Sequence, residues 1–180
     1  MSYTCTKVNS VSSEVAESFW SGGEPYYITE GTLPKWEGSD AANYANFIDI
    51  LTIDDKVECL YVVSLNDYPV VIVPAHDDGD KIRGEMILVR PDTTNSRAFL
   101  YTENGVWSAF VNFWKTEGYT ALHGPAFGGL TMYEYLKAGC ESGIMPCSFT
   151  DEPYAALNSY LPMFVEDTPE FRWITFTFNE

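Results

Sequence analysis

Two periodicities of apolar residues divide the first third of the chain. Residues 3–8, YTCTKV, alternate apolar and polar side chains, and this period of two predicts a strand. Residues 12–23 and 39–51 instead place apolar side chains three and four positions apart, which predicts two amphipathic helices, the first capped by Ser12 or Ser13. The apolar faces consist of Val15, Phe19 and Trp20 in the first helix and of Tyr44, Phe47, Ile48 and Leu51 in the second.

The middle of the chain is rich in β-branched residues. VECLYVVS (57–64) and YPVVIV (68–73) flank Leu65-Asn66-Asp67, and this arrangement predicts a hairpin. HDDGDK (76–81) is rich in turn-forming residues and predicts a second turn. A calcium-binding loop is disfavoured, because its residue spacing is missing. KIRGEMILVR (81–90) predicts a third strand. Its apolar residues on one face are expected to be Ile82, Met86 and Leu88.

The second half of the chain predicts a helix, a short strand, a helix and a last strand, at 103–118, 119–124, 128–140 and 171–178. Apolar residues cover more than half of the first of these helices, so it must pack against a sheet or between layers. This order predicts an α+β fold in one domain, 1–180, with a mixed, mostly antiparallel sheet covered by helices. The apolar residues of the long helix are Val106, Trp107, Phe110, Val111 and Trp114.

Charge narrows the classes of partner. Ten basic and 26 acidic residues give a net charge of −16, which repels nucleic-acid backbones and anionic lipids. We therefore expect no direct nucleic-acid binding, although an acidic inhibitor that imitates nucleic acid is a further possibility. No apolar run reaches the roughly 20 residues of a membrane span, and the N-terminus does not read as a signal peptide. These features predict a location in the cytoplasm of the producing cell.

The cysteines and histidines give no metal motif. Cys5, Cys59, Cys140 and Cys147 form no C-x-x-C pair, and His76 and His123 are the only histidines. This spacing disfavours zinc, so we expect no metal and reduced, mostly buried thiols. The sequence also lacks a P-loop and a G-x-S-x-G elbow, which leaves nucleotide hydrolysis and serine hydrolysis without support.

Two segments carry a resemblance to a known family. MILVRPD (86–92) leads into the long helix, and YEYLKAGC (133–140) closes the later one. With the order of elements over residues 3–178, they resemble the GCN5-related N-acetyltransferase (GNAT) fold. The resemblance implies that Tyr135, in the pattern Tyr-x-x-x-Gly, is a general acid that protonates a departing thiolate, with Cys140 where the family has an aromatic residue. By its position, His123 would be a general base.

The same resemblance implies a basic, glycine-rich loop after residue 90 whose amides bind the pyrophosphate of acyl-CoA at a helix N-terminus. Here no glycine occurs between Arg90 and Gly105, and Asp92 adds a negative charge. We therefore expect no cofactor as the main interpretation, and acetyl-CoA or another acyl-CoA as the alternative. If acyl-CoA binds, the residues that contact it are Val89, Arg90, Thr93, Thr94, Asn95, Ser96 and Arg97.

The overall sequence pattern also resembles the small GNAT-like internal virion proteins of short-tailed bacteriophages, through CLYVVSLNDYPVVIV (59–73), EYLKAGC (134–140) and RWITFTFNE (172–180). The leading hypothesis is thus a non-catalytic or nearly non-catalytic GNAT-like domain that works through protein–protein contacts. Its partners would be other virion proteins, and its location the virion. The alternative hypothesis is an active acyl-CoA-dependent N-acyltransferase. A nucleic-acid-mimicking inhibitor is the third.

Overall fold

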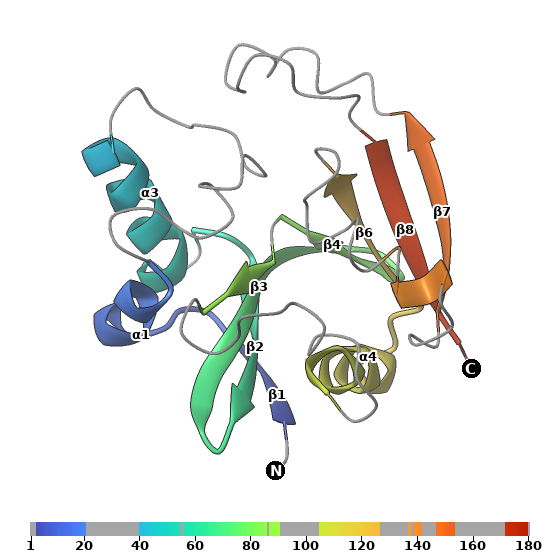
Figure 1. The fold of residues 1–180 in the computed structure, drawn as a ribbon, viewed down its shortest axis with the longest axis horizontal. Helices are drawn as coiled ribbons and strands as arrows, with labels where there is room; N and C mark the ends of the chain where they lie inside the picture. The colour runs from blue at the N-terminus through green and yellow to red at the C-terminus, as the bar shows by residue number, and fades with distance from the viewer. Residues whose placement is uncertain are drawn as a thin grey trace.

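The computed structural model describes residues 3–20, 40–54, 56–85, 87–90, 105–126, 137, 139–141, 147–153 and 172–179. The elements with defined bounds in these residues are three helices and eight strands, and residues 137 and 139–141 are also helical (Figure 1). The helices are α1 (Ser13–Ser18), α3 (Asp40–Thr52) and α4 (Val106–Thr116). The strands are β1 (Tyr3–Val8), β2 (Cys59–Leu65), β3 (Tyr68–Asp78), β4 (Lys81–Gly84), β5 (Leu88–Val89), β6 (Ala121–Ala126), β7 (Cys147–Pro153) and β8 (Arg172–Phe178). No helix in these ranges is long and apolar enough to cross a membrane.

The strands form one sheet in the order β1-β2-β3-β4-β6-β8-β7, and β5 pairs with β3. Among the strands that the structure describes, only β4 and β6 are parallel neighbours, and all other neighbours are antiparallel. Parallel strands need a crossover, and α4 lies in the connection from β5 to β6. The predicted α+β fold with a mixed, mostly antiparallel sheet is confirmed.

The two turns of the central hairpins have the backbone conformations that their residues favour. Asn66 and Asp67 both have positive φ, 51° and 67°, as a two-residue turn between twisted antiparallel strands requires. Gly79 has φ +81° in the next turn, where a side chain would be strained. The second turn is shorter than the predicted 76–81, because β3 continues to Asp78.

The helices cover opposite faces of the sheet (Figure 1). Successive residues of β2 alternate between the two cores, as the strand period requires. The first core lies under α4, where the fully buried Trp114 stacks on Phe110 at 5.1 Å and on Phe178 at 5.9 Å between ring centroids. The second core lies under α1 and α3, where Trp20 contacts Tyr44 and Phe47. The predicted faces of these helices are confirmed.

The third predicted strand is interrupted. Gly84 pairs with Ala75 and Leu88 with Ile72, so the three residues between Gly84 and Leu88 lie opposite only two residues of β3. This extra residue is a β-bulge, and it reverses the face on which later side chains lie. Ile82 therefore lies in the α4 core and Leu88 in the α1/α3 core. The prediction that both lie on one face is wrong, and Met86 lies outside the described residues.

The expectation of reduced thiols is also wrong for two of the four cysteines. Cys140 and Cys147 form a disulfide that joins residues 139–141 to the start of β7. Cys5 and Cys59 are free thiols, and Cys59 is buried. Sequence spacing gave no sign of the bond because its two cysteines are seven positions apart and meet only through the fold.

Candidate functional site

The parallel strands β4 and β6 are neighbours over a short distance only. Their register joins residues 81–83 to residues 121–123, ending at the pair Arg83 and His123. Beyond this point β5 pairs with β3, while β6 continues along β8 (Figure 1). In the part of the chain that the structure describes, the two parallel strands therefore separate directly after His123.

The bulge gives a physical reason for the separation. An extra residue bends the strand that carries it and increases its local twist. The backbone N–H of Glu85 donates to the carbonyl of Pro74 at 2.8 Å, and that of Arg90 donates to Val70 at 3.0 Å, so this strand remains bound to β3. At its start β6 is fixed beside β4, because the N–H of Thr120 donates to the carbonyl of Asp80 at 2.8 Å. The strands thus start together and then diverge.

His123 lies at the point of separation and is paired with a carboxylate. Its Nε2 is 2.7 Å from Oδ2 of Asp78, which comes from the end of β3, and the His123 side chain is 14% exposed. A carboxylate only accepts hydrogen bonds, so Nε2 carries the proton in the neutral ring. The lone pair then resides on Nδ1, which is the atom that can take up a proton.

The electrostatic surroundings favour the neutral form of His123. Burial lowers the pKa of His123 below its ordinary value of 6.5, and the positive charges of Lys81 and Arg83 lower it further, while the Asp78 carboxylate opposes the shift. The net direction is downward. A histidine that is neutral at pH 7 and has one ring nitrogen held by a carboxylate has the properties of a general base.

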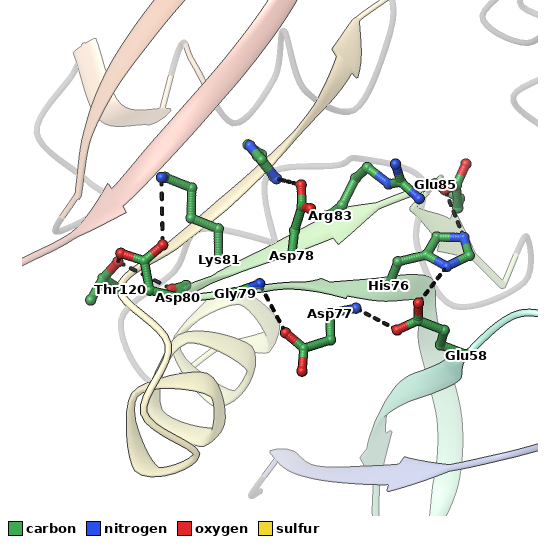
Figure 2. Close-up of polar contacts among 11 residues, drawn as sticks. Glu58, His76, Asp77, Asp78, Gly79, Asp80, Lys81, Arg83, Glu85 and Thr120 are labelled. Atoms are coloured by element: carbon green, nitrogen blue, oxygen red, sulfur yellow. Dashed lines mark hydrogen bonds and ion pairs between the residues drawn. The ribbon is translucent and has the colours of Figure 1, made fainter.

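A second polar network lies beside this pair (Figure 2). His76 Nδ1 is 3.4 Å from Oε1 of Glu58, and its Nε2 is 2.9 Å from Oε1 of Glu85, which is also 3.5 Å from Nε of Arg83. The N–H of Asp77 donates to Glu58 at 2.7 Å, and this backbone hydrogen bond is the main reason why the pKa of Glu58 is lowered. Among the described residues, no group of three or more histidine, cysteine, aspartate or glutamate side chains is arranged to hold a metal ion.

The two networks share one face of the sheet. In the strand register Arg83 pairs with His76 on one side and with His123 on the other, so the three side chains form a row across β3, β4 and β6. Arg83 thus lies between the two histidines, and its charge acts on both His123 and Glu58. Sequence reasoning identified His123 but treated His76 and Asp78 only as parts of a turn.

The N-terminus of α4 has properties that suit an anion. Gly105 is its N-cap and makes no side-chain capping bond. The N–H of Ala109 donates to the carbonyl of Gly105, so the amides of residues 106–108 precede the first helical hydrogen bond. Such amides and the helix dipole favour negative charge. The glycine expected directly after Arg90 is missing from the sequence, and Gly105, the next glycine along the chain, lies at the start of α4.

Of the other predicted site residues, the structure describes Val89 and Arg90. Val89 is buried in the α4 core, and the guanidinium of Arg90 lies over the ring of Tyr68, 4.7 Å from its centroid. The remaining predicted contacts with acyl-CoA and the predicted general acid lie outside the described residues. They are Thr93, Thr94, Asn95, Ser96, Arg97 and Tyr135.

Comparisons with known proteins identify the fold. No protein-family model matches the sequence, and no curated protein matches it. Solved structures do match: an acetyltransferase assigned to the GNAT family from Chromobacterium violaceum has a TM-score of 0.58 at 11% identity, over 98% of this chain and 83% of that one. The chain has the GNAT fold. Its mixed, mostly antiparallel sheet with few helices matches that fold.

Two other GNAT-like structures were solved with ligands. AAC(6')-Ib, in complex with ribostamycin and coenzyme A, has a TM-score of 0.56 at 11% identity, with 97% of this chain and 93% of that one covered. Diaminobutyrate acetyltransferase EctA from Paenibacillus lautus, in complex with L-2,4-diaminobutyric acid and coenzyme A, has a TM-score of 0.51 at 12% identity, with 98% and 97% covered. Identities this low show a shared GNAT fold, and the site itself must carry any argument about activity.

Proposed function

We propose that this protein transfers an acyl group from acyl-CoA to an amine. The observation that carries the proposal is the His123–Asp78 pair at the separation of β4 and β6. The GNAT fold supports it, since structures with this fold were solved with coenzyme A and with amine-containing ligands. The proposal favours the alternative hypothesis of the sequence over the non-catalytic one.

Two features of the described residues fit acyl-CoA. The backbone amides at the start of α4 can donate hydrogen bonds to a diphosphate. The pairing of β4 with β6 ends at Arg83 and His123, and an extended amide-containing chain could pair with the strand edge beyond this point, as an added strand does. The bound coenzyme would supply the acyl thioester. Asp92 and its neighbours lie outside the described residues, so the steric objection from the missing glycines is untested.

His123 is proposed to remove the proton that blocks the acceptor nitrogen. An aliphatic amine is an ammonium ion at pH 7 and cannot attack a carbonyl until it loses a proton. Nδ1 of His123 takes this proton while Asp78 holds Nε2 and stabilises the resulting imidazolium. By resemblance, Tyr135 would donate a proton to the departing sulfur. The net charge of −16 favours the approach of a cationic acceptor.

The experiment compares the two histidines of the chain. Purified wild type, His123→Gln and His76→Gln are incubated with acetyl-CoA and a panel of primary amines, and the acetylated amine is quantified by mass spectrometry. The His123→Gln variant should lose roughly 10²- to 10⁴-fold in turnover, the usual contribution of a general base. His76→Gln should retain turnover because His76 is not the proposed base. Equal turnover by wild type and His123→Gln would remove His123 from the mechanism.

The non-catalytic hypothesis makes the opposite prediction. A GNAT-like domain that acts only through protein contacts, whether in a phage virion or elsewhere, would acetylate no amine in the panel and would not bind acetyl-CoA. Its warrant was the sequence after Arg90, and that segment lies outside the described residues. It stays a prediction, and the same assay separates it from the enzyme.

A further inference from the structure

We propose that Trp173 is a positioning residue that holds the imidazole of His123 in its working orientation. Trp173 comes from β8, on the side of His123 opposite to Asp78 in the strand order. The two ring centroids are 5.0 Å apart and the ring planes meet at 89°. This inference rests on the proposed function, since it assigns Trp173 a role in presenting the base of that reaction.

One hydrogen bond is not enough to fix the ring. Asp78 bonds His123 at Nε2 only, and its own side chain is 47% exposed at the end of β3. A single bond at one ring atom leaves the imidazole free to tilt about that atom. The indole of Trp173 contacts the ring from β8 and restricts this tilt. With both contacts present, the direction of Nδ1 is defined.

Register explains why these two rings meet. His123 pairs directly with Thr175 of β8, and Trp173 lies two residues further along that strand. Residues two apart on a strand share a face, so Trp173 is the diagonal neighbour of His123. An aromatic side chain can span the diagonal distance of about 7–8 Å between such positions. A smaller residue at position 173 would leave the imidazole exposed on this side.

Trp173 also shields His123 from water without changing its charged surroundings. Among the described residues, the charged groups that act on His123 are Asp78 from β3 and Lys81 and Arg83 from β4. On β8, Arg172 is paired with Asp151 instead. Burial is the main reason why the pKa of His123 is lowered, so removal of the indole should raise that pKa while all the charges remain.

The test uses the fact that the chain has only two histidines. The ring proton signals of His76 and His123 are followed by NMR over a pH titration, and His76→Gln assigns them. Trp173→Leu should raise the pKa of His123, whereas Trp173→Phe, which keeps an aromatic ring, should largely preserve it. Trp20→Phe is the matched control because Trp20 packs on Tyr44 and Phe47, under α3.

Kinetics supply the second readout. Trp173→Leu should reduce kcat by roughly ten- to hundredfold, the order expected when a reacting group is misplaced, with KM for acetyl-CoA unchanged. Trp173→Phe should restore most of the turnover. A folded Trp173→Leu protein with an unchanged pKa of His123 would overturn the inference, even if the wild type is active. A wild type that acetylates nothing, with the pKa response intact, would refute the proposed function and leave the Trp173–His123 contact supported.

Discussion

Removal of the carboxylate that holds His123 gives the sharpest single perturbation of the proposed site. Asp78→Asn keeps the shape of the side chain and replaces a charged acceptor at 2.7 Å from Nε2 with a neutral amide. The Asp78 carboxylate opposes the lowering of the His123 pKa, whereas burial and the charges of Lys81 and Arg83 cause it. Without the carboxylate, only the lowering effects remain. The pKa of His123 should therefore fall further.

The expected size follows from the strength of the contact. A hydrogen bond to a charged group contributes about 1.5–3 kcal/mol. The carboxylate accepts from Nε2–H in both protonation states of the ring, so only the additional stabilisation of the imidazolium, which is smaller than this energy, is lost in Asp78→Asn and lowers the pKa of His123. Because the folded pKa of His123 lies below 6.5, the folded state binds fewer protons than the unfolded state between these values. Stability therefore rises with pH across this window, and Asp78→Asn extends the window to lower pH.

The assay is an NMR titration of the two histidine signals in wild type, Asp78→Asn and Asp80→Asn. Asp80 is the matched control because it lies in the same turn and contacts Thr120 and Lys81 instead of His123. Asp80→Asn should change the pKa of His123 only slightly, since exposed charges are screened by solvent and salt. In the kinetic profile, the acidic limb should move to lower pH in Asp78→Asn. A His123 pKa that stays constant or rises in this variant would refute the reasoning.

Two further predictions concern stability. Asp151→Asn should lower the free energy of unfolding by about 1–3 kcal/mol at pH 7, because Lys137 and Arg172 both lose their charged partner, whereas Glu152→Gln should have little effect. Burial raises the pKa of Asp151, but its hydrogen bonds and charge interactions with Lys137 and Arg172 together lower it more, so the net direction is downward. This stability is therefore present above the ordinary aspartate value of 3.8 and is lost as the pH falls. In urea unfolding, the difference in stability between wild type and Asp151→Asn should be smaller at pH 3 than at pH 7. Cys140→Ser with Cys147→Ser should cost about 2 kcal/mol, the entropy of the short loop that the disulfide closes, and Cys5→Ser should leave the disulfide intact. Thiol titration of the denatured wild type should find two free thiols before reduction and four after it, and four before reduction would contradict the bond.

The hairpin, the long helix and the fold class could be predicted because each depends on local pattern. The two β-rich runs of β2 and β3, with Asn66-Asp67 between them, predict the turn of the hairpin, although the register shifts between Val63 and Ser64. The wide apolar surface of α4 can be buried only against a sheet. These features need no knowledge of distant parts of the chain.

The site could not be predicted in the same way. The bulge after Gly84 adds one residue, and a period of two gives no warning of where it falls. Asp78 reaches His123 across β4, and the two residues are 45 positions apart, so neither motif nor spacing connects them. The contact with Trp173 depends on the pairing of β6 with β8, which the sequence does not specify. Only His123 itself was identified, through the resemblance to GNAT proteins.

Calorimetric titration of acetyl-CoA into the purified protein tests the central claim most directly. An acyltransferase should bind one acetyl-CoA per chain, saturably, with a Kd between about 1 µM and 1 mM, the range in which enzymes commonly work. Analogues that consist of the thiol arm of the coenzyme alone should bind more weakly. They lack the diphosphate that the α4 N-terminus is proposed to hold. Absence of any saturable heat across this range, with folded protein, would contradict the enzyme and favour the non-catalytic GNAT-like domain.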